Sequence, residues 1–178
     1  SKLISFSRLV KKKRVDEIID AFTLNLNKHP GINLEIYGEG EEKTKLEKIA
    51  IKANKSSKRI KILGSVEKIE KVVTPGTILI HNSEYEGFGL VMLEAAFSGA
   101  YVLAANVGSS EIEVVGRKKS IGELVDTAKK REDRIKILSS HLDQLCREGY
   151  RFDVDARIKH LSKFDETSAH NKISEIFS

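Results

Sequence analysis

The hydrophobic residues of this chain alternate between two patterns along most of its length. Short runs of aliphatic and β-branched residues, typical of buried strands, are each followed by a longer stretch in which apolar residues recur at helical spacing. The predicted strands cover residues 3–6, 32–37, 60–63, 77–80, 101–104 and 122–125. The predicted helices between them cover residues 15–26, 46–53, 66–73 and 90–97. This alternation favours a parallel sheet that is covered by helices on both faces.

Right-handed crossovers between parallel strands then define the fold class as α/β, a doubly wound Rossmann-like sheet of about six strands. From residue 127 onward the pattern becomes helical only. A long amphipathic helix is predicted from the spacing of Ile135, Leu138 and Leu142, and a further C-terminal helix from Thr167 to Phe177. Because no repeat, linker or low-complexity segment interrupts the chain, we predict a single domain over residues 1–178.

Composition narrows the class of protein. Of the 178 residues, 40% are hydrophobic and 32% are charged, and the formal net charge of +5 points to an anionic partner. A single cysteine excludes a disulfide scaffold and favours a reducing compartment. No apolar run approaches the roughly 20 residues that span a bilayer. We therefore expect a cytoplasmic protein, with association at the cytoplasmic face of a membrane left open.

Ligands of a doubly wound sheet bind at the carboxyl ends of its strands, and candidate chemistry lies there. After the first strand, Arg8 and the run Lys11–Arg14 place several cations where a phosphate would bind, although a solvated basic loop is the alternative. After the second strand, Gly38-Glu39-Gly40 begins like a dinucleotide fingerprint. Because Lys43 stands in place of the third glycine, we interpret this stretch as a turn, and a Rossmann dehydrogenase is disfavoured.

The stretch between the fourth strand and the next helix carries two carboxylates, Glu86 and Glu94, around a glycine turn. The N–H groups at the start of that helix would form a phosphate site. The carboxylates would lie about 12 Å apart along a helix, whereas a glycosidase pair lies roughly 5–9.5 Å apart. They are better suited to accept hydrogen bonds from hydroxyls on two parts of one ligand. The alternative is a turn residue and an exposed helical residue.

Together these stretches resemble the C-terminal, nucleotide-sugar-binding domain of the GT-B glycosyltransferases of group 1 (family 4, retaining). The most specific element is the Glu-x7-Glu motif from Glu86 to Glu94, and Arg8-Leu9 followed by Lys13 supports it. The resemblance extends over nearly the whole chain. It implies the C-terminal half of a longer two-domain enzyme, and the abrupt start at Ser1 agrees with a piece cut from a longer polypeptide.

The resemblance also implies roles for individual residues. Arg8 and Lys13 bind the donor diphosphate and stabilise the leaving phosphate, and Glu86 contacts the donor sugar, so these three are the expected catalytic residues. Glu94 contacts the ribose hydroxyls. The remaining donor-binding positions are Gly87, Phe88, Gly89, Leu90, Gly38, Gly64 and Val66, with the base beside residues 64–66.

The implied reaction is transfer of a hexose from a UDP-, GDP- or ADP-sugar to a glycan, lipid or polysaccharide precursor, with retention of configuration. It needs no metal, no other cofactor and no protein nucleophile, because the leaving phosphate assists a front-side substitution. The expected partners are the nucleotide-sugar donor and the missing N-terminal GT-B domain, and a peripheral membrane contact is left open. Without that domain, we expect this chain alone to transfer no sugar.

Some residues depart from the pattern of the family. Lys11, Asn82 and Tyr101 stand at positions where proline is usual, and Arg14 replaces the frequent glycine after Lys13. Two alternatives remain: a GT-B-like nucleotide-binding module without catalysis, and a nucleic-acid-binding domain. The second is disfavoured because acidic and basic residues interleave and no nucleic-acid-binding motif is present. No metal-ligand spacing occurs, and His81 is predicted to be a loop residue.

Overall fold

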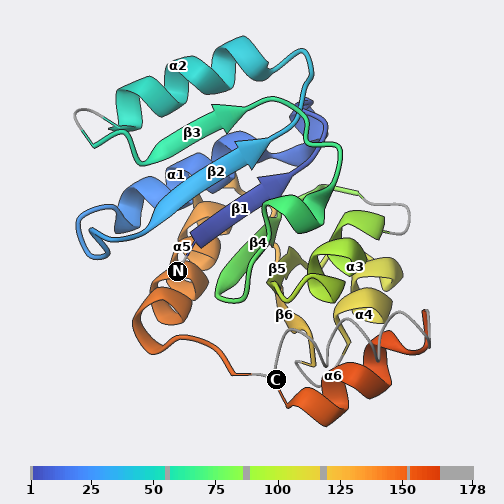
Figure 1. Ribbon diagram of the computed structural model, residues 1–178. Coiled ribbons are helices and arrows are strands. Elements are labelled where there is room, and N and C mark those ends of the chain that lie inside the picture. The colour runs from blue at the N-terminus through green and yellow to red at the C-terminus, as the bar shows by residue number, and fades with distance from the viewer. Residues whose placement is uncertain (1, 55–56, 86–88, 117–119, 152, 165–178) are drawn as a thin grey trace.

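The computed structural model describes residues 2–54, 57–85, 89–116, 120–151 and 153–164. Its centre is a six-stranded parallel sheet with the order β3-β2-β1-β4-β5-β6 (Figure 1). The strands are β1 (Lys2–Phe6), β2 (Asn33–Tyr37), β3 (Ile60–Leu63), β4 (Thr77–His81), β5 (Tyr101–Ala105) and β6 (Gly122–Val125). The helices are α1 (Val15–Asn25), α2 (Lys43–Asn54), α3 (Leu90–Phe97), α4 (Ser109–Val115), α5 (Arg131–Glu148) and α6 (Val154–Leu161). Single 3-10 turns form η1 (Lys11–Lys13) and η2 (Ile69–Lys71). The predicted α/β fold class is confirmed.

The strand order reverses between β1 and β4. From β1 the chain proceeds outward through β2 to β3, and then returns to add β4 on the other edge of β1. Leu3 of β1 is therefore in register with Leu34 on one side and with Ile78 on the other. This reversal makes the carboxyl ends of β1 and β4 the switch point of the sheet, where the flanking loops diverge.

The alternation of side chains along the strands produces two separate cores. One core contains Leu3, Leu34 and Ile78 and is covered by α1, α2 and α5. The other contains Ile4 and Leu79 and is covered by α3, α4 and α6. Figure 1 shows α1 and α5 together on one side of the sheet and α3 and α4 on the other. The central strands β4 and β5 are buried at every position, which explains why their sequences are mostly apolar.

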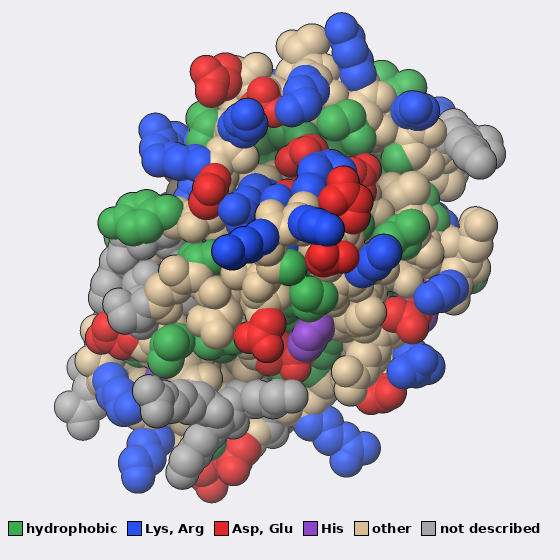
Figure 2. Space-filling view, turned by 180° about the vertical axis from the view of Figure 1, so that it is seen from behind, with side chains coloured by type: hydrophobic (Ala, Val, Ile, Leu, Met, Phe, Trp, Pro, Cys, Tyr) green, Lys and Arg blue, Asp and Glu red, His purple; other side chains and the backbone are tan. Residues whose placement is uncertain are grey.

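The outer surface of α1, α2 and α5 carries mixed charge. Figure 2, which views the molecule from behind, shows basic and acidic side chains interleaved across this face, with no continuous basic patch. Ion pairs account for part of the mixture, such as those of Arg131 with Asp16 and Asp20. The net positive charge of the chain is therefore not gathered on this side of the molecule.

Two features differ from the sequence-based prediction. The predicted helix over residues 66–73 is only the 3-10 turn η2, and α6 was not predicted at all. Asp153 begins α6 by accepting a hydrogen bond from the Ala156 N–H at 2.9 Å. The predicted C-terminal helix from Thr167 to Phe177 lies outside the described residues. Among the helices of the described residues, none is both long enough and apolar enough to cross a bilayer.

Candidate functional site

A cleft of about 770 Å³ opens at the switch point, between the loop after β1 and the start of α3. Its lining includes Ser7, Arg8, Lys12, Lys13 and His81. Three of the described lining residues are cations, and none is a carboxylate. A concave site with one sign of charge concentrates counter-ions. The cleft is therefore suited to an anion.

The 3-10 turn η1 delivers the cations. Arg8 and Lys12 are exposed and make no ion pair with the described residues, whereas Lys13 is half-buried at the cleft wall. Arg14, the next residue, turns away and pairs with Glu84 at 3.4 Å. The predicted basic cluster is therefore split between two places. Arg8 and Lys13 both line the cleft, whereas Arg14 lies outside the cleft lining and pairs with Glu84 of the loop after β4.

The opposite wall is the start of α3. Gly89 is the N-cap in a left-handed conformation, with φ of 72°, and as a glycine it has no side chain with which to cap the helix. Gly89 and Leu90 line the cleft, as predicted for donor-binding residues. Unsatisfied N–H groups at a helix start attract anions. Cations and a helix N-terminus therefore face the same space.

Of the two carboxylates of the Glu-x7-Glu motif, only Glu94 belongs to the residues that the structure describes. Glu94 is exposed on α3, one turn beyond Leu90, and is not among the residues that line the cleft. Its predicted contact with a ribose stays a prediction. Glu86, Gly87 and Phe88, which were predicted to contact the donor, lie outside the described residues.

A second cavity of about 420 Å³ adjoins the first and shares Arg8 with it. Gly38 and Val66, both predicted donor-binding residues, line this second cavity. Gly64 is not part of the lining but lies beside it, because a Cβ atom there would be 3.2 Å from Glu39 Oε1. Arg8 between two cavities is the arrangement that a two-part ligand with a central phosphate requires.

Two stacked aromatic rings are part of the lining of the second cavity. Phe6 and Tyr37 stack with their ring centroids 5.0 Å apart. The Tyr37 hydroxyl donates to Glu35 at 2.8 Å. Burial and this carboxylate raise the pKa of Tyr37 to about 12. The phenol therefore stays protonated and directs its proton toward Glu35.

The glycines of the Gly38-Glu39-Gly40 turn bring two loops into contact. A Cβ atom on Gly38 would lie 1.9 Å from Ser7 O, and one on Gly40 would lie 2.3 Å from Leu9 O. This close approach permits backbone hydrogen bonds, such as Leu9 N–H to Glu39 O at 2.8 Å. Only glycine fits there, since both residues also have positive φ. The turn after β2 thus supports the loop that carries Arg8.

The sequence model of the family described as "Glycosyl transferases group 1" matches residues 1–145. This match covers most of the chain. The chain belongs to the group 1 glycosyltransferases. The family assignment agrees with the predicted resemblance, with the parallel sheet and with a cleft lined by cations at its switch point.

Several group 1 relatives are named N-acetylglucosaminyltransferases. The UDP-N-acetylglucosamine–peptide N-acetylglucosaminyltransferase GtfA subunit of Streptococcus agalactiae is 33% identical over 105 residues, which are 59% of this chain and 20% of that protein. The poly(ribitol-phosphate) alpha-N-acetylglucosaminyltransferase of Staphylococcus aureus is 28% identical over 173 residues, 97% of this chain and 34% of that protein. The chain thus spans between a fifth and about a third of the length of these relatives.

A solved group 1 structure supports the fold. The pneumococcal O-GlcNAc transferase GtfA, in complex with UDP and GlcNAc, matches with a TM-score of 0.73 at 23% identity. The match covers 98% of this chain and 33% of that one. At this identity the likeness concerns the fold, and it agrees with the Rossmann-like sheet described above.

Sequence reasoning missed some residues of this group 1 site. His81 was predicted to be a loop residue, but it is the last residue of β4, is buried, and lines the cleft. Ser7 and Tyr85 also line the cleft. The signal for His81 was available, because it continues the aliphatic run of β4 directly. Within the described ranges, no group of three or more His, Cys, Asp or Glu side chains is placed to hold a metal ion.

Proposed function

We propose that this chain is the donor-binding part of a retaining hexosyltransferase and binds a nucleotide-sugar at its switch-point cleft. The diphosphate would lie between Arg8, Lys12 and Lys13 on one wall and the start of α3 on the other. The observation that carries this proposal is the convergence of three cations and the start of α3 on one cleft without a described carboxylate.

The proposed chemistry follows from that convergence. As the bond between sugar and diphosphate breaks, negative charge develops on the leaving phosphate. Cations and backbone N–H groups that are already in place stabilise this charge with little reorganisation. Arg8 and Lys13 would then perform the task that a metal ion performs elsewhere, and no protein nucleophile is required. Glu86 is retained in the proposal as the residue that contacts the sugar.

The proposed donor is a UDP-sugar, with UDP-N-acetylglucosamine as the first choice because the GtfA relatives carry it in their names. The second cavity would hold the base beside Val66, and Glu94 would accept hydrogen bonds from the ribose. The acceptor would be bound mainly by an N-terminal domain, since the chain spans only part of its relatives' length. We expect no sugar transfer by the chain alone.

Calorimetric titration tests the donor. The chain is titrated with UDP, GDP and ADP and with their sugars, and UDP and UDP-N-acetylglucosamine should bind most tightly. Arg8→Ala and Lys13→Ala should each weaken binding about tenfold, because each removes a charge-assisted contact worth about 1.5 kcal/mol. Arg151→Ala and Lys52→Ala are matched controls, since both side chains are exposed and lie outside the cleft lining.

Two results would count against the proposal. Absence of binding by every nucleotide at millimolar concentration would remove the donor site. Equal weakening by Arg8→Ala and Arg151→Ala would show that only the overall charge of the chain attracts the nucleotide. If added salt steeply lowers the nucleotide affinity of the parent, of Arg8→Ala and of Arg151→Ala alike, this would support attraction by the overall charge rather than a specific site.

A further inference from the structure

Arg14 has an unusual backbone conformation for a residue with a side chain. Its φ of 47° places it in the left-handed region, which among the described non-glycine residues is shared only with Lys58 at 51°. Such a conformation is unfavourable for any residue with a Cβ atom. Arg14 directly follows η1 and begins α1, so this turn determines how Lys13 enters the cleft.

The loop after β4 holds this turn in place. The Arg14 carbonyl accepts a hydrogen bond from Asn82 Nδ2 at 3.3 Å, and the Arg14 side chain pairs with Glu84. The Glu84 N–H donates to the Lys12 carbonyl at 2.8 Å. The loops that follow β1 and β4 are therefore joined directly across the switch point. Both of these loops contribute residues to the cleft.

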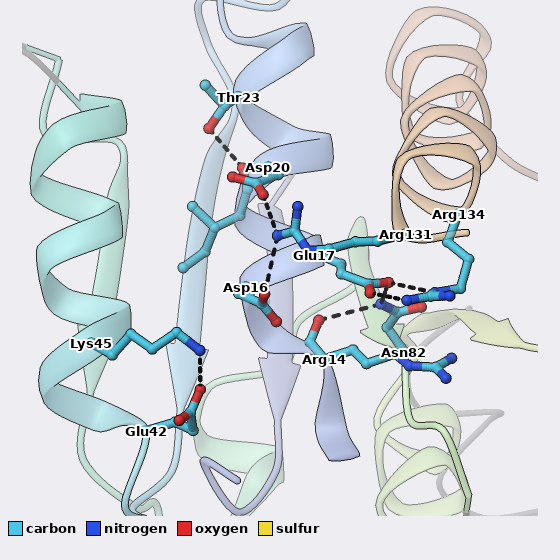
Figure 3. A network of polar contacts seen from close by, with 11 residues as sticks. Arg14, Asp16, Glu17, Asp20, Thr23, Glu42, Lys45, Asn82, Arg131 and Arg134 are labelled. Carbon is cyan, nitrogen blue, oxygen red and sulfur yellow. Dashed lines mark hydrogen bonds and ion pairs between the residues drawn. The ribbon is translucent and has the colours of Figure 1, made fainter. Parts of the chain in front are cut away.

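Asn82 is itself fixed from the opposite side. It is buried, with 8% of its surface exposed, and its amide lies 3.4 Å from Glu17 Oε2. Glu17 accepts two hydrogen bonds from the Arg134 guanidinium, at 2.5 and 3.0 Å. Figure 3 shows Asn82 between the Arg14 carbonyl and the Glu17–Arg134 pair. The amide thus has a fixed carboxylate on one side and the strained turn on the other.

These contacts join two departures noted in the sequence. Arg14 stands where glycine is frequent, and Asn82 stands where proline is usual. Glycine adopts the left-handed region without a penalty, whereas arginine needs a compensating contact. Proline has no hydrogen-bond donor, whereas the Asn82 amide supplies one. The Asn82 amide therefore supplies a contact that supports Arg14 in this conformation.

We propose that Asn82, oriented by Glu17, is a positioning residue that holds Arg14 in its left-handed turn and thereby keeps Lys13 at the diphosphate site. The proposal rests on the proposed function, because Lys13 must contact the donor for its position to matter. Asn82 touches no ligand in this scheme, and its effect on the donor passes through the backbone of residue 14.

The test is a rescue experiment with UDP as the probe. Asn82→Ala should weaken UDP binding about fivefold, as expected for the loss of one supporting hydrogen bond. Adding Arg14→Gly to Asn82→Ala should restore the affinity to within about twofold of the parent, because glycine holds the turn without help. Adding Lys58→Gly instead should restore nothing, although it relieves the same backbone strain elsewhere.

Each outcome decides the proposal. Unchanged UDP affinity in Asn82→Ala overturns it. Equal rescue by Arg14→Gly and Lys58→Gly also overturns it, because it would show that Asn82 acts only through the overall stability of the protein. If Asn82→Ala does not fold, recovery of both folding and UDP binding by Arg14→Gly alone supports it, and any other result overturns it. If the parent binds no nucleotide, the proposed function falls and this inference with it. If the parent binds and Asn82→Ala binds equally well, only this inference falls.

Discussion

The two faces of the sheet are built differently. On the first face, α1, α2 and α5 have 11, 12 and 18 residues and pack mainly with leucine and isoleucine side chains. On the second face, α3, α4 and α6 have only 8, 7 and 8 residues. The second core is rich in alanine, with Ala95, Ala96, Ala100 and Ala104 all buried.

The difference separates anchoring from binding. Small side chains let α3 lie close to the sheet, so that its first residues reach the cleft. The buried Arg157 of α6 donates to the carbonyl of Ala96, in the last turn of α3, and to the carbonyl of Ala100, just before β5. The first face carries the larger apolar core and the ion pairs between α1 and α5. It should therefore dominate stability, while the second face should be sensitive to any change that displaces α3.

The largest effect is expected from the buried ion pair of the first face. Glu17→Ala leaves Arg134 largely buried without its carboxylate, and should lower the free energy of unfolding by about 3–5 kcal/mol. Asp20→Ala is the control, because its ion pair with Arg131 is partly exposed and is worth about 0–1 kcal/mol. Urea unfolding of both variants measures the difference. Similar losses for the two would contradict the proposed contrast.

A large-to-small change should come next. Ile19 is fully buried on α1, and Ile19→Ala should cost about 2–5 kcal/mol through lost burial and the cavity that remains. Leu24→Ala on the same helix should change stability by less than about 0.5 kcal/mol, because Leu24 is exposed. UDP affinity should be unchanged in Ile19→Ala, measured where the variant is fully folded. A loss of affinity would show that the apolar core of the first face, and not only the contact between Glu17 and Asn82, also governs binding.

The second face should instead be broken by a small-to-large change. Ala96→Leu inserts bulk between α3 and the sheet and should cost about 1–3 kcal/mol. It should also weaken UDP binding, because α3 must shift to accommodate the new side chain. Ala53→Leu, at a partly buried position on α2, is the control. Urea unfolding measures the stability of Ala96→Leu, and calorimetry of the same samples measures its UDP affinity. A loss of stability with unchanged UDP affinity would contradict the proposed role of the second face in binding.

The smallest effect concerns Glu35, which is in register with Ile4. Burial opposes ionisation of Glu35, but hydrogen bonds from Lys2 and Tyr37 outweigh it and lower the pKa below its ordinary 4.5. Its stabilisation is therefore complete above that value and is lost as the pH falls through the lowered pKa. The stability difference between the parent and Glu35→Gln should shrink in acid. A difference that is constant with pH would contradict the assignment.

The sequence was sufficient for the sheet but not for its supports. The central strands β1, β4 and β5 are buried along nearly their whole length and are mostly aliphatic, and the outer strands still carry short aliphatic stretches, so the pattern predicted all six strands. By contrast, α6 completely buries Arg157, a charged residue that a hydrophobic pattern counts as solvent-exposed. Burial lowers the pKa of Arg157 to about 10, and its hydrogen bonds to two carbonyls make the burial tolerable.

Much the same holds for the cleft. Arg8, Lys13, Gly89 and Leu90 could be predicted because they follow strands in a recognisable order. The Glu17–Arg134 pair could not, because its partners are separated by 117 residues and only the fold brings them together. Nor could the link between Asn82 and Arg14: both stand out in the sequence as departures from the family pattern, but only the structure shows the left-handed φ of Arg14 and its hydrogen bond with Asn82.

The central place of β1 has a consequence for how the protein folds. β1 pairs on one edge with a strand about 30 residues later and on the other with a strand about 75 residues later, and distant pairings form slowly. The loop carrying Arg8 can therefore be ordered before β4 docks, whereas the cleft exists only afterwards. A nucleotide that requires both walls would have nothing to bind in a transition state that lacks β4. Added UDP should in that case slow unfolding while leaving the refolding rate nearly unchanged.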